Sequence, residues 1–316
     1  MNNEIPVFFA IDNNYAPFLA VALSSAARNC SKERSFRITV LYRELDSGHI
    51  ERLKKFEREN FKIDFFTMCA DTEVFDDREA NRFRCDYILA IYFRLFIASM
   101  FPKYDKAIYL DSDIVVNGDL SLLFDTEIGD NFIGACYDAS ISHSPDLYRY
   151  TEEAIGVKKN EYINSGVLLM NLKKMREEKF EEHFLYLLSK YHFDSVAPDQ
   201  DYINAICNGK IYYLSEKWNA MPNDACKPLV NPFIIHYNLF SKPWRYSGIQ
   251  YEEYFWEYAR NSGQLKEILK IKQGFSKVQE EEDRLCLTTL ISRAKEISKS
   301  KITFKSALQK GEMIRI

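Results

Sequence analysis

One apolar run that ends on two aspartates constrains this chain most. The run Ala107–Leu110 is typical of a buried strand, and Asp111 and Asp113 follow it directly, before an Asn-Gly turn signal at 117–118. Ligands in α/β folds bind at the carboxyl ends of strands, so we expect both aspartates to line a site. Carboxylates this close favour a hard cation such as Mg²⁺ or Mn²⁺ between them. Two solvated loop aspartates would give the same pattern.

Strand and helix patterns alternate along the chain. This alternation predicts an α/β fold with a parallel sheet. We predict strands at 6–11, 36–41, 61–67, 107–110, 132–136, 161–172 and 210–214, with a last strand starting at 233. We predict helices around 19–26 and 50–56, at about 86–99 and 173–191, and from 198 onward, with loops at 71–84 and 140–150.

The composition fits one large domain with an appendage, or two smaller domains. The chain has 316 residues, of which 47% are hydrophobic, and its 42 basic against 46 acidic residues give no field that favours nucleic acid. We therefore expect no nucleic-acid partner. We divide the chain into a main domain, 1–250, and a helical, basic extension, 251–316.

The end of this extension differs in charge from the rest. Residues 284–316 hold eight basic and two acidic residues, and their apolar side chains recur at helical spacing. The apolar positions are Leu287, Leu290, Ile291, Ala294 and Ile297. Such a helix either packs on the main domain or lies on an anionic membrane surface.

Cysteine usage and the first residues indicate the compartment. Seven scattered cysteines, with no Cys-x-x-Cys pair, are typical of buried thiols in a reducing cytosol. No basic region precedes the first apolar run, and no stretch approaches the ~18 apolar residues of a membrane span. We expect a cytoplasmic protein, with peripheral contact at the inner face of the membrane as the variant.

Polar residues in the first half of the chain offer further candidates. The loop Asp12–Tyr15 follows the first strand and could bind a base and ribose, or simply cap a helix. No Gly-x-Gly-x-x-Gly supports a dinucleotide site. Arg94 lies beside a helical apolar stripe, where an arginine is either an ion-pair partner in the structure or a ligand contact.

In the second half, polar groups again gather where elements begin or end. Gly166 inside a strand pattern indicates either the close approach of a ligand or backbone, or a bulge. Asp199 begins a helix and could cap it or hold a polar ligand. His236 ends the last predicted strand and Lys242 follows six residues on, so an imidazole could complete a carboxylate metal site and an ammonium could pair with phosphate.

Taken in order, these motifs resemble glycosyltransferase family 8 from about Val7 to Trp244. The resemblance implies a GT-A fold, a Rossmann-like mixed sheet flanked by helices, with the C-terminal helical extension added to it. It also implies metal-dependent, retaining transfer of galactose or glucose from a UDP-hexose to a saccharide or glycolipid acceptor, in lipopolysaccharide or cell-surface glycan synthesis. The motifs are residues 9–15, Tyr92–Leu95, Tyr109–Asp113, Asn164–Val167, Asp199–Asp201 and His236–Trp244.

Matching positions carry the family's site onto this chain. The resemblance implies a metal centre for Mn²⁺ or Mg²⁺, a nucleotide site and a sugar site, with Gln200, Asp199 and Arg94 as the catalytic group. The implied assignments are Asp111, Asp113 and His236 on the metal; Ala10, Asp12, Asn14 and Tyr15 on uridine; Lys242 on the diphosphate; Arg94, Asp138, Asn164 and Asp199 on the donor sugar; and Gln200 beneath its anomeric carbon.

Chemistry supports front-face attack by the acceptor hydroxyl, because the amide of Gln200 is a poor nucleophile where a retaining hydrolase would use a carboxylate. One position departs from the family: Leu239 stands where a glycine usually lets the backbone approach the diphosphate. A catalytically weak UDP-sugar-binding protein is therefore one alternative. A HAD-type phosphotransferase with Asp111 as nucleophile is another, because 111–115 also fits its Asp-x-Asp-x-Val motif.

Overall fold

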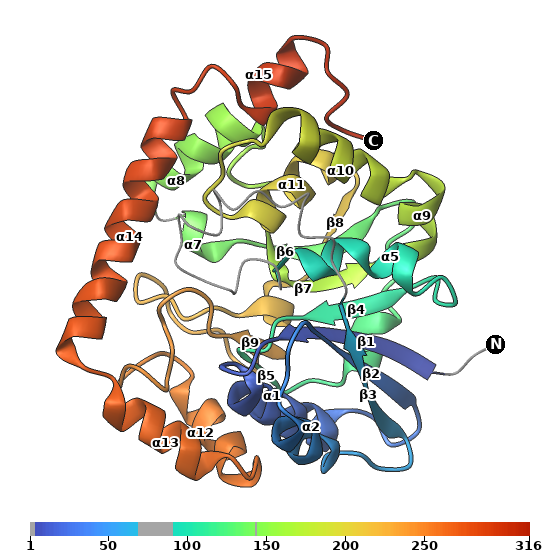
Figure 1. The fold of residues 1–316 in the computed structure, drawn as a ribbon, viewed down its shortest axis with the longest axis vertical. Coiled ribbons are helices and arrows are strands. Elements are labelled where there is room, and N and C mark those ends of the chain that lie inside the picture. The colour runs from blue at the N-terminus through green and yellow to red at the C-terminus, as the bar shows by residue number, and fades with distance from the viewer. Residues whose placement is uncertain (1–3, 69–90, 143) are drawn as a thin grey trace.

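A seven-stranded sheet forms the centre of the computed structural model, which describes residues 4–68, 91–142 and 144–316 (Figure 1). The strand order is β3-β2-β1-β4-β7-β6-β8, and a separate two-stranded sheet joins β5 to β9. The strands are β1 Glu4–Ile11, β2 Ser35–Tyr42, β3 Phe61–Thr67, β4 Ala107–Leu110, β5 Ile114–Val116, β6 Ile133–Tyr137, β7 Ile163–Met170, β8 Ile211–Tyr213 and β9 Ile234–His236.

The sheet is mixed, and this places the candidate residues at one edge. Strands β1, β2, β3 and β4 are mutually parallel, whereas β7 runs antiparallel to both β4 and β6. The alternation alone predicted a parallel sheet, which is wrong for β7. Because Leu110 pairs with Val167, the start of β7 lies beside the carboxyl end of β4.

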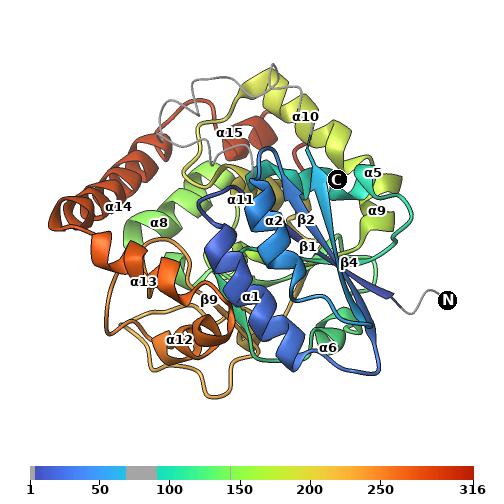
Figure 2. The same cartoon turned by 60° about the horizontal axis from the view of Figure 1, so that its bottom comes forward.

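Helices cover both faces of the sheet. Figure 2 shows α1 and α2 in front of the strands and α5, α9, α10 and α15 behind them. The longer helices are α1 Ala16–Asn29, α2 Ser47–Lys54, α10 Phe180–Tyr191, α11 Pro198–Cys207, α12 Glu252–Asn261, α13 Leu265–Gly274 and α14 Lys277–Ile297. The shorter ones are η2 Phe93–Phe96, α5 Ile97–Met100, α6 Leu120–Phe124, α7 Ala139–Ser142, α8 Pro145–Tyr150, η3 Thr151–Ile155, α9 Leu172–Glu177, η4 Glu216–Asn219 and α15 Phe304–Gln309.

Alternating side chains of the strands feed two separate cores. Val7 and Phe9 of β1 pack with Leu19 and Leu23 of α1 on one face. Phe8, which lies between them in the sequence, belongs to the core on the opposite face. This alternation follows from the period of two residues along a strand.

Two predicted elements differ from the structure. The predicted helix 173–191 is two helices, because Lys179 adopts a left-handed φ of 53° and breaks it. The predicted loop at 140–150 contains α7 and α8; the side chain of Ser144 caps α8, and Pro145 occupies its first turn. The predicted loop 71–84 and the start of the helix at 86 lie outside the described residues.

The last predicted strand matches the structure within a residue, and its pairing is informative. Ile234–His236 forms β9, which runs antiparallel to β5 with His236 opposite Ile114. The backbone N–H of Tyr237 also donates to the carbonyl of Asp113 at 3.0 Å. This pairing brings the end of the last strand back to the aspartates that follow β4.

The C-terminal helices cross the molecule and end in its core. In Figure 1, α14 runs along the left edge from α13 to the region of α8 and α15. Leu287 is 40% exposed, but Ala294, Ile297 and Phe304 are buried in the same core as Tyr202 of α11. Within the described part of the chain, no helix has both the length and the apolar composition needed to cross a membrane.

Candidate functional site

Two carboxylates and an imidazole meet at the carboxyl end of β4. One ligand atom from each of Asp111, Asp113 and His236 lies within 4.8 Å of the other two. His236 Nε2 is 3.3 Å from Asp113 Oδ1 and 3.6 Å from Asp111 Oδ2. Two carboxylate oxygens and one imidazole nitrogen are ligands that suit Mn²⁺. The residues present therefore fit a divalent cation.

A buried lysine occupies the side of this cluster away from Asp111. Lys242, 4% exposed, donates to Asp113 Oδ2 and to the carbonyl of Tyr237. Burial alone would raise the pKa of Asp113, but its neighbours, the Lys242 ammonium foremost, outweigh burial and hold that pKa below its ordinary value. Burial opposes the charge on Lys242 as well, yet Asp113 keeps the pKa of the ammonium raised. Both groups are therefore charged at neutral pH.

Arg94 joins the metal cluster to the next pair of polar residues. It is 3% exposed, and its Nη2 lies 2.9 Å from Asp111 Oδ1 while its Nε lies 3.1 Å from Asp199 Oδ2. Its Nη1 donates to the carbonyl oxygen and the hydroxyl of Ser165 at 2.7 and 3.0 Å. The guanidinium also lies over the ring of Tyr109, 4.3 Å from its centroid. Of the two sequence interpretations, the ion-pair role is present in this structure.

Asp199 and Gln200 project from the first turn of α11 toward β7. The sequence suggested Asp199 as the N-cap, but Ala197 holds that position and Pro198 begins the helix. The hydroxyl of Ser165 donates to Asp199 Oδ2 at 2.9 Å. Burial raises the pKa of Asp199, and Arg94 opposes the rise. The carboxylate is thus tied into the site instead of serving the helix end.

Hydrogen bonds fix both ends of the Gln200 amide. Its Oε1 accepts from the backbone N–H of Ser165 at 2.9 Å, and its Nε2 donates to Asp138 Oδ2 at 2.9 Å. Asn164 Nδ2 donates to the same Asp138 oxygen at 3.2 Å. Asp138, Asn164 and Gln200 are all less than 9% exposed. These three residues form one rigid polar wall.

The predicted nucleotide loop lies at the end of β1. Ala10, Asp12 and Tyr15 are partly buried and Asn14 is exposed. Asp12 Oδ1 accepts from the backbone N–H of Tyr15 at 2.9 Å, which closes the turn before α1. The ring of Tyr15 contacts Phe18, which stacks on Trp244 with centroids 3.9 Å apart. These rings join the loop to the segment that carries Lys242.

Gly166 has a steric reason to be glycine. A Cβ built on it would lie 2.2 Å from Cε1 of His236 and 2.7 Å from Oδ2 of Asp111. The sequence indicated a close approach to a ligand or backbone at this position. The close neighbours are instead the side chains of two candidate metal ligands, so any larger residue would displace them.

Leu239 adopts the conformation that a glycine would adopt more easily. Its φ is 48°, in the left-handed region, and its side chain is 47% exposed. A non-glycine residue in this region costs roughly 1–2 kcal/mol. The departure from the family pattern therefore strains the loop without moving it out of the left-handed conformation.

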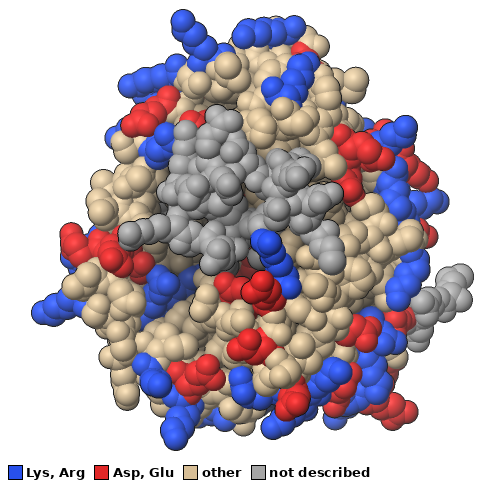
Figure 3. Space-filling view, in the orientation of Figure 1, with Lys and Arg blue, Asp and Glu red and all other residues tan. Residues whose placement is uncertain are grey.

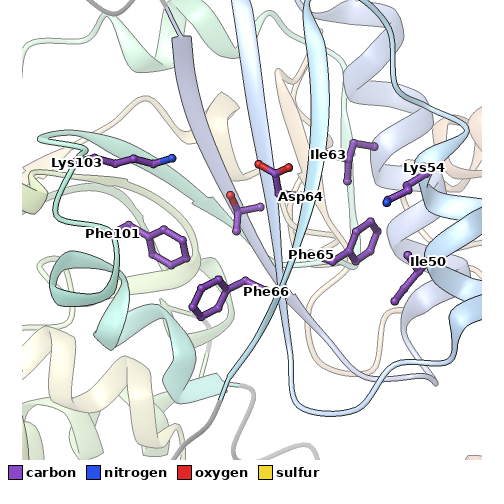
Figure 4. Close-up of a pocket in the computed structure, with 9 residues that line it drawn as sticks. Ile50, Lys54, Ile63, Asp64, Phe65, Phe66, Phe101 and Lys103 are labelled. Carbon is purple, nitrogen blue, oxygen red and sulfur yellow. The ribbon is translucent and has the colours of Figure 1, made fainter.

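A hollow elsewhere on the molecule shares no residue with this cluster. It has a volume of about 690 Å³ and borders the edge strand β3. Figure 4 shows Ile63 and Phe65 on the side of Ile50 and Lys54, and Asp64 and Phe66 on the side of Phe101 and Lys103. Its lining is mostly aromatic and aliphatic, without converging polar groups. The polar cluster at the ends of β1, β4 and β7 remains the candidate site.

The structure brings the predicted residues together in two adjoining groups. The first group is the metal cluster, and the second is the polar wall with Asp199. Arg94 and Asn219 contact both groups. The loop after β1 reaches the segment of Lys242 through the rings of Tyr15, Phe18 and Trp244. Sequence reasoning did not identify Asn219, which donates to Asn164 Oδ1 at 2.9 Å and lies 3.0 Å from His236 Nδ1. It also missed the hydroxyl of Tyr109, which donates to Asp111 Oδ1 at 3.0 Å. Asn219 has no spacing or motif that distinguishes it. Tyr109 belongs to the motif Tyr109–Asp113, but the motif assigned no role to its hydroxyl.

Comparisons with known proteins agree with this architecture. The sequence model of glycosyl transferase family 8 matches residues 6–248. A putative glycosyltransferase of Haemophilus influenzae is 31% identical over 220 residues, which are 69% of this chain and 64% of that protein. Lipopolysaccharide 1,2-glucosyltransferase of Escherichia coli K12 is 24% identical over 255 residues, 75% of this chain and 72% of that protein. This chain thus spans a little under two thirds of the first relative.

Two solved structures have the same fold. The galactosyltransferase LgtC, in complex with donor and acceptor sugar analogues, matches with a TM-score of 0.66 at 25% identity, over 81% of this chain and 96% of that one. The bifunctional glycosyltransferase WbbM matches with a TM-score of 0.73 at 24% identity, over 87% of this chain and 52% of that one. The mixed sheet is therefore a GT-A fold. The phosphotransferase alternative has no support from these matches.

Proposed function

Because this chain belongs to glycosyl transferase family 8, we propose that it transfers galactose or glucose from a UDP-hexose to a hydroxyl of a saccharide or glycolipid, with retention. The observation that carries the proposal is the junction of a metal-ligand cluster with a buried polar wall through Arg94, at one end of the sheet. The names of two relatives, a lipopolysaccharide glucosyltransferase and a galactosyltransferase, support glycan synthesis as its setting.

Asp111, Asp113 and His236 would hold Mn²⁺, or Mg²⁺ in its place. Bound there, the cation would neutralise charge on the departing UDP. Lys242 lies beside Asp113, and a diphosphate next to the cluster would offer its ammonium a second anionic partner. In the structure the ammonium of Lys242 donates to Asp113 and to the carbonyl of Tyr237. In this proposal it would turn from Asp113 toward the phosphate when UDP is bound.

The loop after β1 would bind uridine. Tyr15 offers a ring for stacking and Asp12 a carboxylate for the ribose, while Ala10 and Asn14 border the same turn. Contacts between Tyr15, Phe18 and Trp244 support this assignment because they place the loop against the segment of Lys242.

The polar wall would hold the donor sugar. Asp138, Asn164 and Asp199 supply acceptors and a donor for sugar hydroxyls, and the contact with Arg94 holds Asp199 in place. Gln200 cannot act as a strong nucleophile, because it is an amide and both its ends are engaged. The acceptor hydroxyl would therefore attack from the face that UDP leaves, with the phosphate oxygen taking its proton. Gln200 would stabilise the positive charge that develops at the anomeric carbon.

Leu239 favours one second candidate, a UDP-sugar-binding protein with weak turnover. Its strained backbone and partly exposed side chain border the segment of Lys242. Incubation with UDP-glucose or UDP-galactose and Mn²⁺, with released UDP as the readout, separates the two. UDP release from one of the donors supports the transferase. Tight donor binding without release would leave the binding protein.

For the extension, we propose that 251–316 serves mainly as a packed appendage of the 1–250 domain. Three basic residues of the tail pair with acidic residues of the body: Arg293 with Asp194 at 2.6 Å, Lys295 with Asp146 at 3.0 Å and Lys305 with Glu153 at 2.9 Å. A membrane role would rely on the other lysines, and Figure 3 shows basic side chains along the top edge, near α15.

A cytoplasmic location, with peripheral contact to the inner face of the membrane as its variant, is part of the proposal. The exposed thiol of Cys286 suits a reducing compartment. Replacing Lys299, Lys301 and Lys310 by glutamine tests membrane contact without opening the core. If wild type and variant sediment equally with anionic vesicles, these lysines carry no membrane contact.

A further inference from the structure

Asn219 connects the imidazole of His236 in the metal cluster to Asn164 of the polar wall. It is 3% exposed at the end of η4, which follows β8. Its Oδ1 lies 3.0 Å from Nδ1 of His236, and its Nδ2 donates to Oδ1 of Asn164 at 2.9 Å. Asn219 thus connects these two side chains directly.

The orientation of the Asn219 amide follows from a fixed backbone donor. The backbone N–H of Gly166 donates to Oδ1 of Asn164 at 3.0 Å, and Nδ2 of Asn164 donates to Asp138 at 3.2 Å. Asn164 thus presents an oxygen to Asn219, which must answer with its NH₂ group. The remaining oxygen of Asn219 then faces His236.

This orientation selects one tautomer of His236. Because Oδ1 of Asn219 can only accept, Nδ1 of His236 must carry a proton, so the neutral ring is the tautomer with its lone pair on Nε2. Nε2 is the atom that faces the carboxylates of Asp111 and Asp113. A metal ligand needs this form, and residues that hold the other ring nitrogen commonly fix it.

Backbone contacts and Gly166 leave the imidazole little freedom. Ala220, next to Asn219, donates to the carbonyl of Ile234 at 2.9 Å and accepts from the N–H of His236 at 2.8 Å. Gly166 also lies close to the ring, where a Cβ would be 2.2 Å from Cε1 and 2.8 Å from Nδ1. The hydrogen bond to Asn219 and the close packing of Gly166 therefore both restrict the ring.

We propose that Asn219 is a positioning residue that sets the tautomer of His236 for metal binding and links the metal site to the sugar-binding wall. The proposal rests on the proposed function, since it requires a cation at His236. It predicts that the two hydrogen bonds of Asn219 have separable effects. The bond to His236 governs metal affinity, and the bond to Asn164 governs the extra affinity that the donor sugar adds to UDP.

Two substitutions separate the effects. Asn219→Ala removes both bonds and should weaken Mn²⁺ binding ten- to a hundredfold, the range for partners of ligating histidines. Asn219→Asp keeps an acceptor for Nδ1 but places an oxygen against Asn164. It should hold Mn²⁺ at least as tightly as wild type while losing most of the difference in affinity between UDP-hexose and UDP. A merely structural role would move both affinities together.

The measurements are a Mn²⁺ titration followed by electron paramagnetic resonance of the free ion, and calorimetry with UDP and with UDP-hexose. Asn29→Ala is the matched control, because Asn29 makes several part-buried hydrogen bonds away from the site. Its Mn²⁺ affinity should equal that of wild type. If Asn219→Ala does not fold, Asn219→Asp alone decides, by whether metal and sugar affinities separate.

Two results would overturn the proposal in distinguishable ways. Wild-type Mn²⁺ affinity in Asn219→Ala, or parallel losses of metal and sugar affinity in Asn219→Asp, would remove the role of Asn219 and leave the proposed function intact. Absence of Mn²⁺ binding by the wild-type protein would remove both.

Discussion

Replacing Gly166 by alanine should disable the metal site while leaving the sheet folded. The added Cβ would lie 2.2 Å from His236 Cε1 and 2.7 Å from Asp111 Oδ2. The ring has to retreat by roughly 1 Å to restore ordinary contact, several times the tolerance of about 0.2 Å for a metal-ligand distance. We therefore expect Mn²⁺ affinity to fall at least tenfold.

The Gly166→Ala variant should lose only a small part of its free energy of unfolding. Overpacking a strand position costs about 1–3 kcal/mol, and alanine regains roughly 0.5–1 kcal/mol over glycine in backbone entropy. The net loss of about 0–2.5 kcal/mol lies within the 5–15 kcal/mol typical of folded domains. Gly166 is absent from the glycines with positive φ, so alanine meets no further strain.

The assay is calorimetric titration of UDP with Mn²⁺ present, beside thermal unfolding of the same sample. Gly134→Ala is the matched control in the same sheet, because its Cβ would meet Ile128 and Leu214 at 3.2 and 3.4 Å and no metal ligand. It should bind as wild type does. Undiminished Mn²⁺ and UDP binding by Gly166→Ala would refute the steric reasoning.

Other consequences can be measured in the same way. Asp113→Ala should abolish Mn²⁺-dependent UDP binding. It should also destabilise the fold by about 3–5 kcal/mol, because Lys242 stays buried without its carboxylate partner. The double variant that adds Lys242→Met should regain stability in urea unfolding but should not regain UDP binding. Phe304→Ala should cost about 3–5 kcal/mol and lower turnover, since the ring packs on Tyr202 of α11. Burial raises the pKa of Asp201 above 3.8, so its contribution to stability falls as pH rises through the interval above that value; Asp201→Asn should flatten this slope.

A control variant or a contradicting result accompanies each of these predictions. Ile302 is 57% exposed, so Ile302→Ala should change neither stability nor turnover, in contrast to Phe304→Ala. If Asp113→Ala is as stable as wild type, the buried pair with Lys242 is not the constraint we describe. For Asp201, the folded group holds its proton more tightly than the unfolded one, and identical pH slopes in wild type and variant would contradict the burial argument.

Periodicity and strand-end chemistry predicted a large part of the fold. The strands at 36–41 and 61–67 match β2 and β3 within a residue, and 107–110 is β4. The buried strand β4 is a continuous apolar run, whereas the edge strand β3 begins with alternating apolar and charged residues. The direction of β7 could not be predicted this way. An antiparallel strand with both faces buried has the same apolar run as a parallel one, and only its pairing with β4 distinguishes them.

In the candidate site, too, residues at strand ends could be predicted from the sequence, and residues whose role depends on tertiary pairing could not. Asp111, Asp113 and His236 stand at strand ends, where sequence reasoning looks for ligands, and the structure brings them together. Asn219 was missed because its role depends on the pairing of η4 with β9, a contact between segments that no local spacing encodes. The break at Lys179 was missed for a related reason: a lysine with positive φ carries no glycine or proline signal.

Proton NMR of the anomeric signal during turnover is the most direct test of retaining, metal-dependent hexosyl transfer by this polar cluster. With UDP-glucose or UDP-galactose, Mn²⁺ and a saccharide acceptor, we expect release of UDP and a first product with an α-linkage, the configuration of the donor. A β-linked first product would contradict the role given to Gln200, and no product from either donor would contradict the transferase itself.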